Sequence, residues 1–490
     1  MLRDATYLSE QIKQKKISSL ELLEESLEKI KKLNPKYNAI VAFDEDLARQ
    51  EIKNHVSTGG LFEGVLMPLK MLGQEHKGLP ATASSRLFKD ELAHFDDAFT
   101  RQIMKAGFIP FGQTNSPEFG FKNITDSALY RDTKNAWNPD YYPGGSSGGA
   151  ASAVASGMFP IAAASDGGGS IRIPASWSGL IGLKPTRGKM PQGPMSYRGW
   201  QGASTSGAMT ISVRDTARFL AQTQITQEIT PYQSSLLPVE ELLNIQAVKR
   251  KLKIAFSLQT PISSVEVSQD ARLAMKKAVQ FLESKGHIVE EVDYPLNARP
   301  LIETYYQMNA AETAAMLSPF EKMTGKKLTN QQVEPLTYGL IQAGKNVPAT
   351  SYIHSLNMWD KANEAFTTKI FNHYDLFLTP TTTKTAIKIG EELICQSLIE
   401  KLMHMEEFSL EEQTSILSES FEKSLQYSPH PFIVNLTGQA AISLPIYVNE
   451  KTNLPLGVQF MGRKNSEILL LELAKQFEDE GQFILPEVYR

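Results

Sequence analysis

The sequence predicts an α/β fold, in which a large mixed, mostly parallel twisted sheet is surrounded by α-helices in a single domain. From about residue 60, short apolar runs bounded by Gly and Pro alternate with stretches of helical periodicity. Residues 251–295 read as one complete strand, helix and strand unit. No internal repeat, low-complexity tract or long linker divides the 490 residues, which favours one domain over several.

The composition is that of an ordinary globular protein, with 41% hydrophobic and 21% charged residues. Because 50 Lys and Arg are offset by 54 Asp and Glu, giving a net charge of −4, neither nucleic acid nor an anionic membrane is expected as a partner. The opening residues lack the apolar core of a signal peptide, and Cys395 is the only cysteine, so no internal disulfide can form. We therefore expect a cytoplasmic protein.

The first part of the chain, residues 1–60, is expected to be helical. Ser18 and Glu21 have the spacing of a capping box, and the apolar residues that follow recur every three or four positions. The dipeptide Asn34-Pro35 is expected to end this helix, because the residue before a proline disfavours helical backbone.

Strands and helices are expected to alternate through the middle of the chain, residues 61–225. Strand candidates there include Gly107–Thr114 and Phe159–Ala164. In the 251–295 unit, a helix from Ser268 to Lys285 is stopped by Gly286.

The segment from about 300 to 430 is rich in helix formers and is expected to be a helical elaboration over the same sheet. Ser409 and Glu412 form a second candidate capping box, and the apolar run at 376–380 is a strand candidate.

Two clusters of glycine and serine, 24 residues apart, lie between Gly144 and Arg172. The second cluster begins at Asp166 and follows a buried-strand candidate, so it should lie beyond the carboxyl end of a strand, where open α/β sheets place their sites. Its successive main-chain N–H groups can converge on an anion and so form an oxyanion hole. These groups belong to Gly167, Gly168, Gly169 and Ser170.

The first cluster, with Ser146 and Ser147 between paired glycines, matches the nucleophile elbow G-x-S-x-G twice. An elbow needs a strand directly before it, whereas Asn138–Pro143 is turn-like. A flexible Gly/Ser linker is a second alternative, although linkers are not normally flanked by an alanine helix and an apolar strand.

A serine nucleophile needs a base, and none of the eight histidines lies in a recognisable catalytic context. Lys70 is the best candidate, because it lies in the apolar segment 65–72, where a strand would bury its stem. To act as a base near pH 7, its pKa must fall by roughly 3 units, about 4 kcal/mol of bias against the charged form. Burial can supply a shift of this size, so Ser-Lys chemistry is open.

These positions together resemble the amidase signature family in residue type, order and spacing: Lys70, the Gly-Gly-Ser146-Ser-Gly-Gly segment and the Asp166-Gly-Gly-Gly-Ser170-Ile-Arg172 segment. Further matches span most of the chain, namely DATYLSEQIKQKKISSLELLEESLEKI, GQTNSPEFG, GLIGLKPTRG, LFLTPTT and NLTGQAAISLP. The resemblance implies the fold of that family and a Ser-cisSer-Lys triad, with residues 61–225 as the catalytic core. Ser170 would be the nucleophile, Ser146 the bridging serine after a cis peptide bond, and Lys70 the base.

The activity implied by the resemblance is hydrolysis of a carboxamide to a carboxylic acid and ammonia or an amine, through an acyl-enzyme. No metal or organic cofactor is required, and the expected partner is a small-molecule amide. Asp166 and Arg172 are expected to support the loop that carries Ser170. The family often has Asp directly after the catalytic lysine, whereas Met71 stands here, so the polar support of Lys70 is expected to differ.

Three alternatives remain open at this point. Met158-Phe-Pro and the segment 198–203 are similar to hydrolases of the 6-aminohexanoate cyclic-dimer type. A tRNA-dependent amidotransferase A-type subunit and a non-catalytic member of the fold are the other two. The identity of the amide and the choice between linear and cyclic substrates also stay open at this point. The same is true of the oligomeric state, for which a homodimer is one candidate.

Overall fold

The computed structural model describes residues 2–490, in which strands and helices alternate through most of the chain. The strands are β1 (Ile40–Ala42), β2 (Leu66–Lys70), β3 (Ile109–Thr114), β4 (Asp126–Ser127), β5 (Arg131–Asp132), β6 (Ala162–Asp166), β7 (Ile181–Lys184), β8 (Thr205–Thr210), β9 (Lys253–Phe256), β10 (Ile288–Glu291), β11 (Leu376–Pro380), β12 (Ala441–Asn449) and β13 (Leu454–Gly462).

The helices are α1 (Ala5–Lys13), α2 (Ser19–Tyr37), α3 (Glu45–Asn54), α4 (Ala98–Lys105), α5 (Gly148–Ala155), α6 (Arg172–Ser178), α7 (Val213–Thr223), α8 (Val239–Leu243), α9 (Gln269–Ser284), α10 (Arg299–Thr324), α11 (Pro335–Lys345), α12 (Ala349–Phe366), α13 (Gln396–Met403), α14 (Leu410–Leu425), α15 (Pro431–Thr437) and α16 (Glu467–Asp479). No helix within residues 2–490 combines the length and the apolar content needed to cross a membrane.

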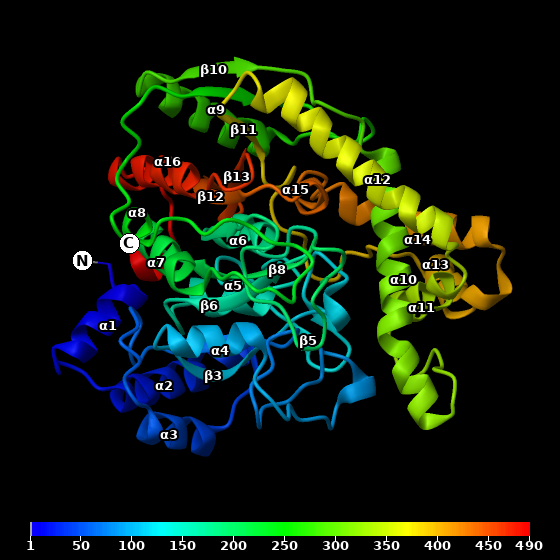
Figure 1. Cartoon of the computed structure of the whole chain (residues 1–490), viewed down its shortest axis with the longest axis horizontal. Coiled ribbons are helices and arrows are strands. Elements are labelled where there is room, and N and C mark those ends of the chain that lie inside the picture. The colour runs from blue at the N-terminus through cyan, green and yellow to red at the C-terminus, as the bar shows by residue number, and fades with distance from the viewer. Residues whose placement is uncertain (1) are drawn as a thin grey trace.

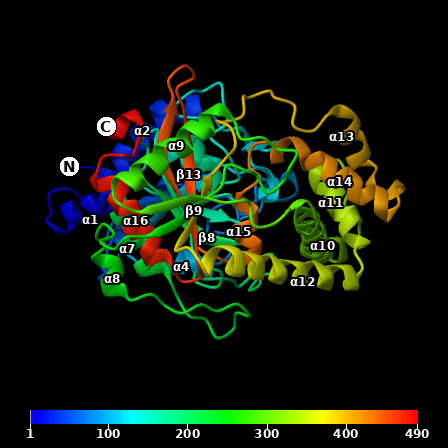
Figure 2. The same cartoon turned by 90° about the horizontal axis from the view of Figure 1, so that it is seen from above.

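An eight-stranded sheet with the order β10-β9-β11-β13-β12-β7-β8-β6 forms the centre of the molecule (Figure 1). Its two faces pack against different helices (Figure 2). On β6, Ala163 belongs to the core shared with α7, α9 and α16, whereas Ala162 and Ala164 belong to a core shared with α5 and α6. Helices on both faces of one sheet confirm the predicted α/β fold class.

The sheet is mixed, as predicted, but antiparallel pairs outnumber parallel ones. Parallel pairing joins β9 to β10 and to β11, while the other five pairs of neighbours run antiparallel. The expectation of a mostly parallel sheet rested on the 251–295 unit, whose helix α9 makes the long crossover that parallel strands need. In contrast, β12 and β13 are joined by the short turn 450–453, which only an antiparallel pair can use.

The N-terminal segment confirms one prediction and corrects another. Ser18 and Glu21 form the capping box at the start of α2. The helix does not end at Asn34-Pro35 but continues to Tyr37, because a proline near the last turn removes little of the helix's hydrogen bonding. Asn38 then ends the helix in the left-handed conformation, with φ of 50°.

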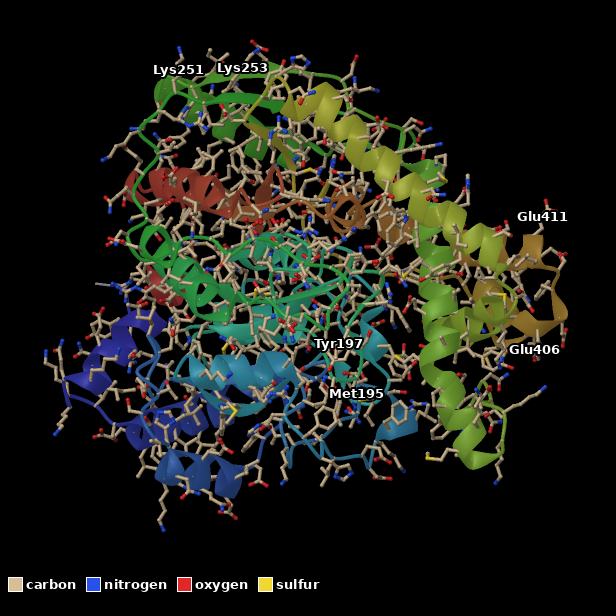
Figure 3. All side chains as sticks on the ribbon, in the orientation of Figure 1. Met195, Tyr197, Lys251, Lys253, Glu406 and Glu411 are labelled. Atoms are coloured by element: carbon tan, nitrogen blue, oxygen red, sulfur yellow. The ribbon has the colours of Figure 1, made fainter. Side chains whose placement is uncertain are left out.

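Helices dominate the segment from about 300 to 430, as expected, and β11 and the capping box of Ser409 and Glu412 are where the sequence placed them. Helices α10, α11, α13 and α14 lie on the side of the molecule away from both termini (Figure 1). Lys251 and Lys253 lie at the start of β9, at the top of Figure 3, whereas Glu406 and Glu411 lie near the start of α14, at its right. The division at residues 60, 225, 300 and 430 stays a prediction.

The approach of α10 to α11 generates a stability prediction. A Cβ on Gly344 would collide with the backbone carbonyl of Ala310, whereas one on Gly339, in the same helix, would meet the movable end of the Leu402 side chain. We expect Gly344→Ala to lower the melting temperature by several degrees despite the better helix propensity of Ala. Gly339→Ala is the matched control and should lower it much less in a thermal melt followed by circular dichroism. Equal melting temperatures would contradict the close approach.

Candidate active site

Lys70 lies where the two main sheets meet. It is the last residue of β2, the edge strand of the three-stranded sheet β1-β3-β2, and β2 contacts β6, the edge strand of the large sheet. Its ammonium group is completely buried and lies 2.7 Å from Ser146 Oγ and 3.0 Å from Ser165 Oγ. The side chain of Gln74 ties the strands together, because it accepts from the Lys70 N–H and donates to the Ala164 carbonyl.

The surroundings of Lys70 disfavour its charge. Burial lowers the pKa of Lys70 to about 7, while the Asp166 carboxylate acts in the opposite direction and raises it. Both serine oxygens can accept from the ammonium, but neither carries a compensating negative charge. Lys70 is therefore divided between its neutral and protonated forms near pH 7.

Ser146 follows a cis peptide bond, Gly145–Ser146, and lies in the turn before α5. Helix α5 is built of small buried residues. A Cβ on Gly149, in its first turn, would collide with the backbone nitrogen of Asn115, so the start of α5 packs tightly against the chain just after β3. Ser147 points elsewhere and donates to the Ser165 carbonyl. Within residues 2–490, neither serine is hydrogen-bonded to a histidine, and no strand directly precedes them, so the elbow alternative lacks its structural context.

Asp166 and Arg172 form an ion pair that is completely buried. The guanidinium donates to both carboxylate oxygens at 2.9 and 3.0 Å and also to Gln459 Oε1 and Asn435 Oδ1. Burial would raise the pKa of Asp166, but the Arg172 charge and hydrogen bonds outweigh it and hold the pKa well below its usual range. Asp166 is therefore ionised at neutral pH.

The glycine loop after β6 presents only part of the expected nest. The Gly169 N–H donates to Asp166 Oδ1 at 2.7 Å, so this amide is removed from the predicted oxyanion hole. The Asp166 carboxylate accepts this hydrogen bond because it lies next to the loop. The sequence pattern could not show which N–H of the loop would donate to it. In the part of the chain from residue 2 to residue 490, the N–H groups of Gly167, Gly168 and Ser170 have no protein acceptor.

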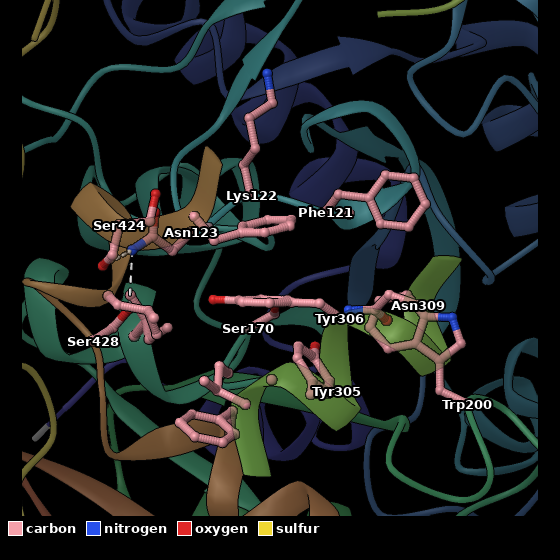
Figure 4. A pocket seen from close by; sticks show the side chains of 18 residues that line it. Phe121, Lys122, Asn123, Ser170, Trp200, Tyr305, Tyr306, Asn309, Ser424 and Ser428 are labelled. Carbon is pink, nitrogen blue, oxygen red and sulfur yellow. Dashed lines mark hydrogen bonds between the residues drawn. The ribbon is translucent and has the colours of Figure 1, made fainter. Parts of the chain in front are cut away.

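Ser170 lines a pocket that Gly145 and Gly168 also border (Figure 4). Six of its eighteen lining residues are aromatic, namely Phe121, Trp200, Tyr305, Tyr306, Phe421 and Phe432. Ser170 is partly exposed, whereas Ser146 and Lys70 are buried. Within residues 2–490 no hydrogen bond joins Ser170 directly to Ser146, so the structure brings Lys70 and Ser146 into contact and places Ser170 on the cavity side.

The sequence reasoning missed three residues that hold this arrangement: Ser165, Gln74 and Asn435. Ser165 contacts Lys70, Gln74 holds the backbone of the same lysine, and Asn435 donates to both the carbonyl and the carboxylate of Asp166. Ser165 directly precedes Asp166, so its nearness to the site was a usable signal. Asn435 lies in a motif that marked the resemblance, but nothing in one sequence ties it to Asp166.

Comparison with known proteins identifies the family of this chain. A family model described as Amidase matches residues 21–471. The chain belongs to the amidase family. The resemblance predicted from Lys70, Ser146 and Ser170 is therefore confirmed at the level of the family.

Among its amidase relatives, a lipoamidase of Enterococcus faecalis is 35% identical over 487 residues, which cover 99% of this chain and 64% of that protein. This chain thus spans less than two thirds of the lipoamidase. The 6-aminohexanoate-cyclic-dimer hydrolase of Paenarthrobacter ureafaciens is 29% identical over 495 residues, covering 97% of this chain and 94% of that enzyme. A solved structure of a 6-aminohexanoate cyclic dimer hydrolase complexed with substrate matches 100% of this chain and 99% of its own, with a TM-score of 0.88 and 28% identity.

The buried ion pair generates a second prediction. Arg172→Ala leaves the Asp166 carboxylate buried without its charge partner, which typically costs about 3–5 kcal/mol of unfolding free energy. Urea denaturation should show a loss in this range. Arg299→Ala breaks an ion pair to Glu422 that is about one third exposed, and such pairs contribute less than about 1 kcal/mol. Equal effects of the two substitutions would contradict the central role of the buried pair.

Proposed function

We propose that this protein is an amidase that hydrolyses carboxamides through an acyl-enzyme, with Lys70, Ser146 and Ser170 as its triad. The observation that carries the proposal is the contact of 2.7 Å between Ser146 and a buried lysine whose pKa is about 7. A lysine that can lose its proton near neutral pH is what a serine nucleophile without histidine requires. Family membership supports the same reaction class.

In the proposed first step, the Ser170 hydroxyl rotates toward Ser146 as substrate fills the cavity. Ser146 Oγ takes the proton of Ser170 while its own proton passes to neutral Lys70. Ser170 Oγ forms a bond to the carbonyl carbon, and the carbonyl oxygen becomes an oxyanion. Catalytic hydrogen bonds are often long before substrate binds. The lack of a direct hydrogen bond between Ser170 and Ser146 within residues 2–490 is therefore compatible with this step.

In the next step, the oxyanion is bound by the N–H groups of Gly167, Gly168 and Ser170, which have no protein acceptor within residues 2–490. As the C–N bond breaks, Ser146 donates its proton to the leaving nitrogen and recovers one from protonated Lys70. Water then attacks the acyl-enzyme by the same relay, which releases the carboxylic acid and restores Ser170. Asp166 and Arg172 support the loop and take no proton.

Hydrolysis of a 6-aminohexanoate cyclic dimer or a related oligoamide is the second candidate. The match to that enzyme's structure over the whole chain favours it, and so do the aromatic and aliphatic side chains in the cavity wall, which suit a substrate with apolar methylene chains. The lipoamidase relative likewise directs attention to amides with an apolar acyl chain. We propose a cytoplasmic location, which the sole cysteine supports.

The triad is tested by substitution. Lys70→Ala, Ser146→Ala and Ser170→Ala should each lower kcat by at least about a thousandfold, because members of one proton relay fail together. Release of p-nitroaniline from hexanoyl p-nitroanilide measures this, and 6-aminohexanoate cyclic dimer in the same assay series tests the second candidate.

A fluorophosphonate probe separates the remaining alternatives. It should label wild-type protein on Ser170 and leave Ser170→Ala unlabelled, while Ser147→Ala keeps the label. Labelling that moves to Ser147 or depends on a histidine would indicate an elbow hydrolase. Absence of label on folded wild-type protein would indicate a non-catalytic member of the fold.

The pKa of Lys70 predicts the pH dependence of activity. Only neutral Lys70 can accept a proton, and its pKa of about 7 means that the protonated form dominates below pH 7. We therefore expect kcat/KM to fall about tenfold per pH unit below pH 7 and to level off above about pH 8. The pH profile of p-nitroanilide hydrolysis measures this, and a rate independent of pH from 5 to 8 would exclude Lys70 as the base.

A further inference from the structure

We propose that Tyr305, on helix α10, is a positioning residue that sets the geometry of the oxyanion-binding amides through the Gly167 carbonyl. The inference rests on the proposed function and extends it to a residue outside the triad and its loop. Tyr305 lies in the helical segment that shapes the substrate cavity, far in sequence from β6 and α6. Figure 4 shows it beside Ser170 in the cavity wall.

The contact that carries the inference is a hydrogen bond of 3.1 Å from the Tyr305 hydroxyl to the Gly167 carbonyl oxygen. The Gly167–Gly168 peptide is trans, so the carbonyl of Gly167 and the N–H of Gly168 point in opposite directions. Fixing one end of this peptide therefore fixes the other. The Gly168 N–H is one of the groups without a protein acceptor in residues 2–490. The hydrogen bond from Tyr305 to the Gly167 carbonyl therefore sets the direction in which this N–H points.

The glycine loop needs such a restraint, because glycine has the widest conformational freedom of any residue. Asp166 holds the far end of the loop by accepting from Gly169 and Ile171. At the near end, a Cβ on Gly168 would collide with the Tyr305 hydroxyl, which shows how closely the hydroxyl covers this peptide. The Asp166 carboxylate and the Tyr305 hydroxyl thus hold opposite ends of the three glycines.

Tyr305 is itself held firmly. Its ring lies edge-on to Trp200, with centroids 6.1 Å apart, and at the same distance from Phe432. The Asn309 side chain, one helical turn later, lies beside the hydroxyl. Burial raises the pKa of Tyr305 well above its usual value, so the hydroxyl remains a donor throughout the working pH range.

The test compares Tyr305→Phe with Tyr447→Phe, which removes a tyrosine hydroxyl bonded to Asp270 and outside the cavity. With hexanoyl p-nitroanilide, Tyr305→Phe should lower kcat about tenfold or more and leave KM within about twofold, because loss of a whole oxyanion donor costs about 10²–10³ and loosening one costs less. Tyr447→Phe should change neither. A rise in KM with unchanged kcat would show that Tyr305 contributes to substrate binding in the cavity and not to the oxyanion-binding amides, which would overturn the proposal.

Two inhibitors sharpen the distinction. Hexanal can form a tetrahedral adduct with Ser170 and should bind Tyr305→Phe more weakly by the factor seen in kcat. For 1-hexanol, which forms no oxyanion, the inhibition constant should remain the same. Equal weakening of both inhibitors would again show a loss of cavity shape only.

Hydrogen exchange measures the restraint without catalysis. The amides of residues 167–170 should exchange at least about threefold faster in Tyr305→Phe than in wild type, whereas Tyr447→Phe should match wild type. If wild-type protein neither turns over amides nor takes the fluorophosphonate label, the proposed function fails, and exchange still decides whether Tyr305 restrains the loop. Unchanged exchange and unchanged kcat in an active enzyme would overturn the role of Tyr305 alone.

Discussion

The buried pair of Asp166 and Arg172 is the interaction on which the rest of the site depends. It joins the end of β6 to the start of α6, and through Gln459 and Asn435 it reaches β13 and α15. A buried ion pair gives little net stability unless its remaining hydrogen-bonding groups are satisfied, and here the carboxylate also receives two backbone N–H groups and an amide. This pair therefore contributes a fixed shape to a segment of three glycines that could adopt many others.

Two completely buried charges lie near one another in this protein and behave in opposite ways. Asp166 keeps its charge because a cation and several donors surround it, whereas Lys70 contacts only neutral serine oxygens and loses much of its affinity for a proton. The position of Lys70 at the junction of two sheets explains its lowered pKa, because its side chain is completely buried where β2 contacts β6. In the proposed reaction, one charge maintains geometry and the other moves a proton.

Much of the fold and the burial of Lys70 could be predicted from the sequence, because local signals carried them. The capping boxes at Ser18 and Ser409, the strand at 376–380 and the apolar surroundings of Lys70 are all contained in short segments. The pairing direction of the strands was mispredicted, since it depends on which distant segments become neighbours. The same limit applies to Gly169, whose N–H is taken by Asp166, and to Tyr305 and Asn435, which reach the loop from segments more than a hundred residues away.

The position in the chain of helix α10, which lines the cavity, has a consequence for how this architecture tolerates change. Helices α10 to α12 leave the sheet after β10 and return at β11, and both strands flank β9 in parallel register. The entropy of closing such an excursion grows only with the logarithm of its length, so residues can be added or removed there at little thermodynamic cost to the sheet. Helix α10 and the helices that follow it before β11 can therefore diverge in length and composition while β9, β10 and β11 keep their alignment.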